Sequence, residues 1–286
     1  MKLNRRITVR DTMPGTFIEG SHANAAGRRD YKLYVPRSHA GAPAPLLVML
    51  HGCGQDPDDF ARGTGMNLLA DESGCLVLYP AQSTGANPSR CWNWFNAMDQ
   101  RRGQGEPSII AGMTLAVMEN HAIDPAQVYV AGLSAGGAMA TIMGTLYPDL
   151  YAAVGVHSGL PFASAYDLPS ALAAMNGDFR RGQAVGRPLP IIVFHGDRDT
   201  TVHPANGDEL VRHLAQRGMA EPGRVPDGHA YTRTLYPDEA GGVHAEHWLV
   251  HGAGHAWFGG NARGSYTDGR GPDASREMMR FFRTRR

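Results

Sequence analysis

The sequence predicts an α/β protein with a mostly parallel central sheet flanked by helices. Short apolar runs alternate along the chain with stretches of helical pattern, which is typical of a parallel sheet covered on both faces. The clearest run, residues 46–50, contains no polar residue, as expected for a strand buried on both faces. With 286 residues, of which 42% are hydrophobic, the chain fits one domain with a sizeable core.

The apolar runs define the strands of this single domain, residues 1–286. The expected strands cover residues 31–36, 46–50, 75–79, 128–131, 153–158, 190–194, 231–236 and 246–250. The first alternates in polarity and should form a hairpin with residues 16–21, so residues 1–30 are expected to be an extension with an edge strand.

Helical patterns fill most of the intervals between these strands. The expected helices cover residues 58–71, 107–121, 135–147, 168–175, 209–218 and 274–283. Pro107 suits a first helical turn, and Pro148 ends the helix before it. Residues 160–187 occupy the position of a lid but are few, so we expect a small lid or none and an open site.

Charge and hydropathy exclude several classes of partner. Lys and Arg total 27, as do Asp and Glu, so the formal net charge is zero and no overall field favours nucleic acid or an anionic membrane. No apolar stretch reaches the length of a membrane span. The first ten residues are basic without the apolar core of a signal peptide, so we expect a cytoplasmic protein, or a secreted one if a leader was removed. The oligomeric state is not indicated.

Ser134 lies at the centre of the most informative motif. It follows the apolar run 128–131, has glycines at positions 132 and 136, and precedes the helix predicted from residue 135. A sharp strand-to-helix turn that exposes a serine needs this spacing, because side chains two residues away would collide with neighbouring backbone. We therefore expect Ser134 to be a nucleophile.

The glycine-rich stretch 51–55 follows the buried strand 46–50. A sharp strand-to-helix turn at a nucleophile is called a nucleophile elbow. In hydrolases with such an elbow, the oxyanion hole combines one N–H from this loop with the N–H of the residue after the nucleophile. The N–H groups of Cys53 and Ala135 are the expected donors.

An acid and a histidine follow the serine in chain order. Asp199 comes after strand 190–194, and His255 lies in a glycine-rich loop after strand 246–250. The order serine, acid, histidine is that of the α/β-hydrolase fold, in which imidazole takes the serine proton and the acid orients the imidazole. Asp197 and His251 are the competing candidates for these two roles.

Residues 80–106 form a long loop without periodicity that contains residues 91–95, Cys-Trp-Asn-Trp-Phe. Long loops in compact domains are usually functional or disordered, and the aromatic cluster disfavours disorder. Trp92, Trp94 and Phe95, together with Trp257 near His255, are candidates for substrate binding, with packing of the loop as the alternative.

The three cysteines lack the spacing of a metal site. Cys75 is expected in the core, whereas Cys53 and Cys91 fall in loops near the site and could form a disulfide. A disulfide would indicate an oxidising compartment rather than the cytoplasm. Residues 244–247, His-Ala-Glu-His, do not match a zinc motif, so neither metal nor cofactor is expected.

Five motifs in order carry a resemblance to a known family. They are His51-Gly52-Cys53-Gly54-Gln55, Cys91-Trp92-Asn93-Trp94-Phe95, Gly132-Leu133-Ser134-Ala135-Gly136-Gly137, His195-Gly196-Asp197-Arg198-Asp199-Thr200-Thr201-Val202 and Gly252-Ala253-Gly254-His255-Ala256-Trp257. From residue 31 onward the chain resembles polyhydroxybutyrate depolymerase-type esterases, which are similar to the feruloyl and acetylxylan esterases of carbohydrate esterase family 1.

The resemblance implies an α/β-hydrolase fold, a Ser-His-Asp triad and cleavage of short hydroxyacyl or aryl esters. We therefore expect a serine carboxylic-ester hydrolase acting on a small-molecule or polyester substrate through an acyl-enzyme. A serine peptidase or acyltransferase on the same fold is the alternative. A non-catalytic ligand-binding relative is disfavoured, because no triad member is missing.

Overall fold

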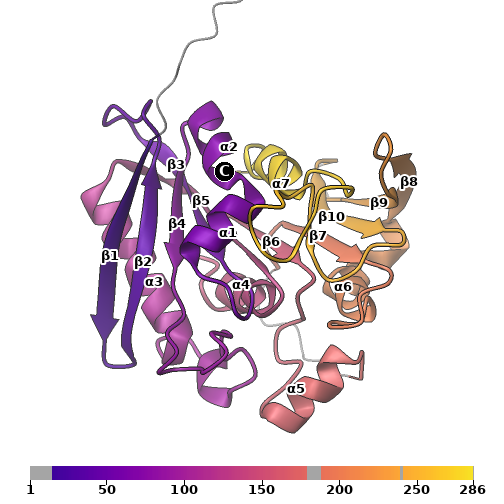
Figure 1. Ribbon diagram of the computed structural model, residues 1–286, viewed down its shortest axis with the longest axis horizontal. Coiled ribbons are helices and arrows are strands. Elements are labelled where there is room, and N and C mark those ends of the chain that lie inside the picture. The colour runs from indigo at the N-terminus through magenta and orange to yellow at the C-terminus, as the bar shows by residue number, and fades with distance from the viewer. Residues whose placement is uncertain (1–14, 179–187, 239–240, 286) are drawn as a thin grey trace, which may run out of the picture.

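A single ten-stranded sheet runs through the protein, with helices on both of its faces (Figure 1). The computed structural model describes residues 15–178, 188–238 and 241–285. The strand order is β1-β2-β4-β3-β5-β6-β7-β10-β9-β8, and the six strands from β4 to β10 in this order are parallel. The predicted mostly parallel α/β sheet is therefore confirmed.

Antiparallel strands close both edges of the sheet. On one side β1 pairs with β2 and β2 with β4, and on the other β10 pairs with β9 and β9 with β8. The strands are β1 Thr16–Asn24, β2 Gly27–Val35, β3 Ala44–Leu50, β4 Leu76–Pro80, β5 Ile123–Leu133, β6 Ala153–His157, β7 Ile191–Gly196, β8 Met219–Arg224, β9 Ala230–Pro237 and β10 Val243–Val250. A separate short pair joins β11 Trp257–Phe258 to β12 Thr267–Asp268.

Within the described residues, seven α-helices cover the two faces. They are α1 Pro57–Thr64, α2 Met66–Ser73, α3 Gly105–Asn120, α4 Ala135–Leu146, α5 Leu168–Met175, α6 Ala205–Val211 and α7 Ala274–Phe282. Helices α1, α2 and α7 share a core layer with Leu47 and Met49 of β3. Helices α3 to α6 share the opposite layer with Leu46, Val48 and Leu50, so the alternation of strand side chains supplies both faces.

The C-terminal helix seals one face of the sheet. Its inward residues Met278, Phe281 and Phe282 are at most 1% exposed, as the amphipathic pattern predicts. The Phe282 ring stacks on Tyr129 of β5, with centroids 4.8 Å apart. This packing fixes the central strand that leads to Ser134.

Two helices and one edge strand are among the elements that differ from the sequence-based expectation. The single helix expected over 58–71 is two helices, because Gly65 adopts a left-handed conformation with φ 63° that ends α1 and begins α2. The helix expected over 209–218 begins earlier, at Ala205, and continues after Val211 as the 3₁₀ helix η2, Arg212–Arg217. Strand β8 was not predicted, because it is an exposed edge strand without an apolar face.

The segment expected to be a small lid contains one short helix, α5, in its described part. Its remainder, residues 179–187, lies outside the described residues, as do residues 1–14 of the N-terminal extension. Within the described ranges, no helix combines the length and apolarity needed to cross a membrane.

Candidate active site

Ser134 stands on a sharp turn between β5 and α4. Its backbone has φ 57° and ψ −120°, a strained conformation for a residue with a side chain. A β-carbon at Gly132 would overlap the Gly136 carbonyl, and one at Gly136 would overlap the Leu50 carbonyl at the end of β3. The two glycines therefore permit the turn and the close approach to β3 that the spacing predicted.

Asp199 and His255 form a buried pair at the same edge of the sheet. Asp199 follows β7 and His255 follows β10, and the Asp199 Oδ2 lies 2.6 Å from the His255 Nδ1. The Asp199 side chain is 0% exposed and that of His255 is 11% exposed. With Nδ1 committed to the carboxylate, Nε2 is the nitrogen of His255 that can accept a proton.

The surroundings of Asp199 keep it ionised. Its Oδ1 accepts hydrogen bonds from the backbone N–H groups of Thr201 and Val202, at 2.9 and 2.8 Å. Burial alone would raise the pKa of the Asp199 carboxyl, but hydrogen bonds from His195 and His255 and from the Val202 backbone hold it well below its usual range. A permanent carboxylate can therefore stabilise a charged imidazole at His255.

The competing candidates form a second pair in the same two loops. Asp197 Oδ2 lies 3.0 Å from His251 Nδ1, and Asp197 Oδ1 accepts the Gly252 N–H at 2.7 Å. These side chains are 34% and 40% exposed, and the His251 Nε2 is already hydrogen-bonded to the Thr232 hydroxyl at 2.9 Å. This pair braces the turn after β10.

His157, at the end of β6, connects the serine to the histidine loop. Its carbonyl accepts the Ser134 N–H at 2.9 Å, and its buried Nε2 accepts the Phe258 N–H at 3.0 Å. Phe258 lies three residues after His255. His157 therefore fixes the backbone at Ser134 and also the backbone of the loop that contains His255.

The expected oxyanion loop lies against the elbow and is tied to the long loop after β4. Cys53 and Cys91 form a disulfide, and the Gly54 N–H donates to the Ser89 carbonyl at 2.8 Å. Since the Ser134 N–H donates to the His157 carbonyl, it is not available to an oxyanion. The N–H of Ala135, at the start of α4, therefore stays the predicted oxyanion donor on this side of the site.

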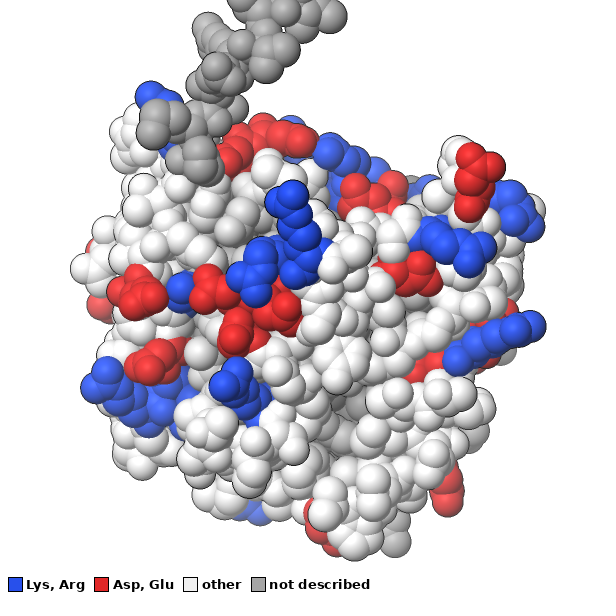
Figure 2. Space-filling view, in the orientation of Figure 1, with Lys and Arg blue, Asp and Glu red and all other residues white. Residues whose placement is uncertain are grey.

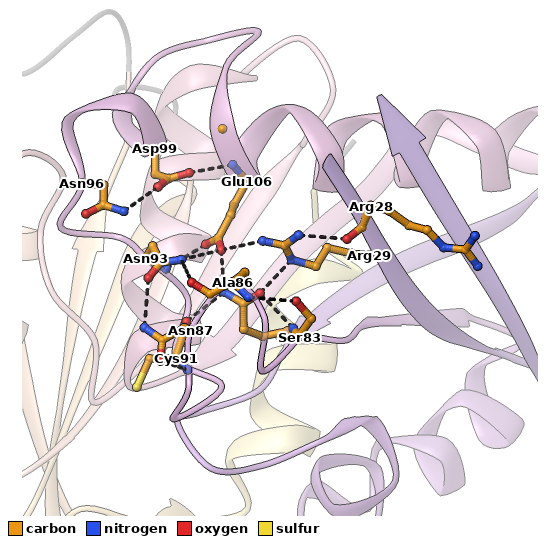
Figure 3. Close-up of polar contacts among 12 residues, drawn as sticks. Arg28, Arg29, Ser83, Ala86, Asn87, Cys91, Asn93, Asn96, Asp99 and Glu106 are labelled. Carbon is orange, nitrogen blue, oxygen red and sulfur yellow. Dashed lines mark hydrogen bonds and ion pairs between the residues drawn. The ribbon is translucent and has the colours of Figure 1, made fainter. Parts of the chain in front are cut away.

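A buried polar network anchors the long loop to the body of the protein (Figure 3). The Glu106 carboxylate of α3 accepts from Arg29 Nη2 at 3.1 Å, and from the Asn93 backbone N–H and side-chain amide at 2.7 and 2.9 Å. The Gln82 amide bridges Glu106 and the Cys91 carbonyl. Arg29 and Glu106 are 8% and 4% exposed, so the ion pair is inside the protein.

A second carboxylate completes this network. Asp99 accepts the Glu106 N–H, and burial together with the nearby Glu106 charge raises the pKa of Asp99 to about 6. Sequence reasoning missed this network, because its members come from distant parts of the chain. The one signal was an acidic residue, Glu106, in the first turn of a helix whose central part is mostly apolar.

The tryptophans proposed to bind substrate are mostly interior residues. Trp92 and Trp257 are 0% and 1% exposed, and the Trp257 Nε1 donates to Ser275 in the core. This placement corrects the expectation for these two: each packs in the interior and offers no surface to a ligand. Trp94 is 6% exposed and packs edge-on against the partly exposed Phe95, so a substrate contact stays a prediction there.

The His244–His247 stretch does not gather as a metal-binding group. It runs along β10, where alternate side chains point to opposite faces. Glu246 is committed to Arg233 and Arg280, at 3.1 and 2.6 Å.

Several known proteins resemble this chain in sequence or in fold. Residues 29–221 match the family model described as esterase PHB depolymerase. Poly(3-hydroxyalkanoate) depolymerase C of Paucimonas lemoignei is 36% identical over 229 residues, covering 75% of this chain. Only 55% of that depolymerase is covered, so the chain spans about half its length.

Two further relatives are esterases. Feruloyl esterase B of Thermothelomyces thermophilus is 29% identical over 260 residues, covering 79% of this chain and 87% of that protein. The solved acetyl xylan esterase from Aspergillus awamori superposes with a TM-score of 0.76 at 21% identity, covering 94% of this chain and 99% of its own. The latter likeness shows that the fold is that of the α/β-hydrolases.

Proposed function

Because the chain belongs to the esterase PHB depolymerase family, we propose that it is a serine carboxylic-ester hydrolase that works through an acyl-enzyme on Ser134. The observation that carries this proposal is the buried Asp199–His255 pair, which lies at the same sheet edge as the strained serine turn.

We propose the following mechanism for these groups. His255 Nε2 removes the Ser134 proton as Oγ attacks the ester carbonyl, and Asp199 stabilises the imidazolium that forms. The N–H groups of Cys53 and Ala135 stabilise the tetrahedral oxyanion. His255 then protonates the leaving alcohol, and a water molecule activated by the same imidazole releases the acid.

The segments that follow β4 and β6, whose carboxyl ends lie at the same sheet edge as Ser134, support an uncharged, partly apolar substrate. In Figure 2, basic and acidic side chains alternate without a large field of one sign, and the lower edge, where α5 lies in Figure 1, is mostly uncharged. Four exposed apolar side chains belong to α5, the segment before it and η1 Ala97–Gln100: Met98, Tyr166, Leu168 and Leu172. The Gln100 side chain joins η1 to the Ala165 carbonyl, at 2.5 Å.

The relatives suggest two ester classes, hydroxyalkanoate oligomers or polymers and feruloyl-type aryl esters. Comparing hydroxybutyrate oligomers, methyl ferulate and p-nitrophenyl esters of graded length would rank them by kcat/KM. An organophosphonate should label Ser134 in a tryptic digest and should not label S134A. Labelling that persists in S134A, or no turnover of any ester in the panel, would contradict the proposed function.

The disulfide bears on where the protein works. Cys53 and Cys91 are joined, whereas Cys75 is buried and free. Disulfides persist in oxidising compartments, so we infer that the protein folds in one rather than in the cytoplasm. Mass spectrometry of protein purified from its native host, alkylated without reductant, should show one modified cysteine after unfolding. Three modified cysteines would overturn the inference.

A further inference from the structure

His51 is a buried histidine that the proposed mechanism does not use. It follows β3 at the start of the oxyanion loop and is 1% exposed. Its Nδ1 lies 2.8 Å from the Gly52 carbonyl oxygen, and its Nε2 lies 3.0 Å from the Gln82 backbone nitrogen. Both ring nitrogens are therefore engaged with backbone.

These two contacts fix the tautomer of His51. A carbonyl oxygen only accepts and a backbone N–H only donates, so Nδ1 carries the hydrogen and Nε2 the lone pair. Burial lowers the pKa of His51 to about 4, which keeps the ring neutral near pH 7. Asp56, Asp59 and Arg90 are the charged residues that act on the ring, and they do not reverse this effect.

The hydrogen bond to Gly52 determines where the next N–H points. The Gly52–Cys53 peptide is trans, since the described residues contain no cis bond. In a planar trans peptide the carbonyl and the N–H point in opposite directions. Holding the Gly52 oxygen against His51 therefore turns the Cys53 N–H away from His51.

The preceding peptide is fixed as well, because the Gly52 N–H donates to Gln55 Oε1 at 2.9 Å. On the other side of the ring, Gln82 is held by Arg29, Glu106 and the Cys91 carbonyl. The polar network around Glu106 (Figure 3) thus holds Gln82, and the Cys53–Cys91 disulfide holds the loop that contains Gly52. These are the two residues to which His51 is hydrogen-bonded.

We propose that His51 is a positioning residue that aims the Cys53 N–H at the substrate oxyanion through its Nδ1–H bond to the Gly52 carbonyl. The inference rests on the proposed function, since it presupposes the oxyanion formed on Ser134. It adds a residue whose role is exerted through the backbone rather than by contact with substrate.

Two substitutions separate this role from simple filling of space. In H51N the amide nitrogen can occupy the place of Nδ1 and donate to Gly52, whereas H51Q reaches the place of Nε2 and loses that donor. Removing an oxyanion donor costs about 10²–10³-fold in kcat. If the Cys53 N–H only points in the wrong direction, the loss should be smaller. We expect kcat to fall about 10–100-fold in H51Q and less than about 5-fold in H51N, with KM changed less than about 3-fold.

A space-filling role predicts the opposite order, because glutamine is closer to histidine in volume than asparagine is. H247Q, at a buried position of β10 that is 5% exposed, is the matched control and should keep kcat within about 2-fold. H51Q with wild-type kcat, or with a smaller loss than H51N, would overturn the positioning role alone. A wild-type protein that neither hydrolyses esters nor labels at Ser134 would remove the proposed function and this inference together.

A measurement on the wild-type protein guards against variants that fail to fold. In a crystal structure of the adduct with an alkylboronic acid on Ser134, one boronate oxygen should lie about 2.7–3.1 Å from the Cys53 nitrogen. The Gly52 carbonyl should remain on the His51 Nδ1. A boronate oxygen without contact to the Cys53 N–H would overturn the inference.

Discussion

Two aspartate–histidine pairs arise from the same two loops, yet they differ in burial and in what the second imidazole nitrogen does. Asp199 and His255 are nearly enclosed, and the carboxylate is saturated with N–H donors. Asp197 and His251 are partly exposed, and the His251 Nε2 is hydrogen-bonded to the Thr232 hydroxyl. Pairing alone therefore does not identify a catalytic dyad, so our assignment of Asp199 and His255 rests on the burial of that pair and on the hydrogen bond that occupies the His251 Nε2.

The largest expected effect separates the two pairs directly. D199N keeps the shape of the side chain but removes the charge that orients and stabilises the imidazole of His255. A similar change in a known triad lowers kcat by about 10⁴-fold, and we expect a loss of about 10³–10⁴-fold here. Steady-state kinetics on a p-nitrophenyl ester, with circular dichroism as a folding control, would measure it. A loss under about 10-fold would break the assignment.

Removing the disulfide perturbs the oxyanion side while leaving both pairs intact. The bridge closes a loop across a sequence separation of 38, so C53S/C91S should lower the free energy of unfolding by about 2–4 kcal/mol. Because the Cys53 N–H loses an anchor, kcat should fall about 10-fold. Urea unfolding and initial rates would test this. Unchanged kcat at reduced stability would show that the bridge is structural only.

The pH dependence of stability should distinguish the two aspartates. The pKa of Asp199 is held below its unfolded value of about 3.9. It therefore contributes stability that is present above pH 4 and is lost as the pH falls further. Between pH 5 and 3, the free energy of unfolding of D199N should fall less steeply than that of the wild type, by up to about 1.4 kcal/mol per pH unit.

The matched substitution D197N should reduce the slope of the free energy of unfolding against pH by less than D199N does. Hydrogen bonds from Gly252 and His251 also lower the pKa of Asp197 against the opposing effect of burial, but solvent screens this exposed pair. Equal slopes for D199N and the wild type would contradict the buried, ionised state assigned to Asp199.

The smallest expected effect comes from the exposed pair itself. In D197N or H251Q the turn after β10 loses a brace, so stability should fall by no more than about 1 kcal/mol. We expect kcat to change less than about 3-fold, because neither side chain reaches Ser134 in the proposed mechanism. A loss in H251Q comparable to that in H255Q would transfer the general base to His251.

The main parts of the candidate site could be proposed from the sequence because each has a local signal. Gly132 and Gly136 are required by backbone crowding around Ser134, and the chain order of Asp199 and His255 follows from the sheet topology. The apolar runs likewise located every strand from β3 to β7, because strands buried on both faces contain few polar residues.

What the sequence could not provide depends on distant contacts. Glu106 meets Arg29 across 77 residues and Asn93 across 13, and neither pairing has a periodic signal. The sequence does not show whether an aromatic residue in a loop faces solvent or the core. Trp92 and Trp257 were therefore expected to contact substrate, whereas both lie in the interior. The break at Gly65 was hidden inside an otherwise continuous helical pattern.

The most direct test of the central claim is the second-order rate constant for phosphonylation of Ser134, measured side by side in the wild type, D199N and D197N. This rate reports activation of the nucleophile without dependence on the acyl group. We expect a loss of at least about 10³-fold in D199N and a change within about 3-fold in D197N. A larger loss in D197N than in D199N, or labelling at a residue other than Ser134, would contradict it.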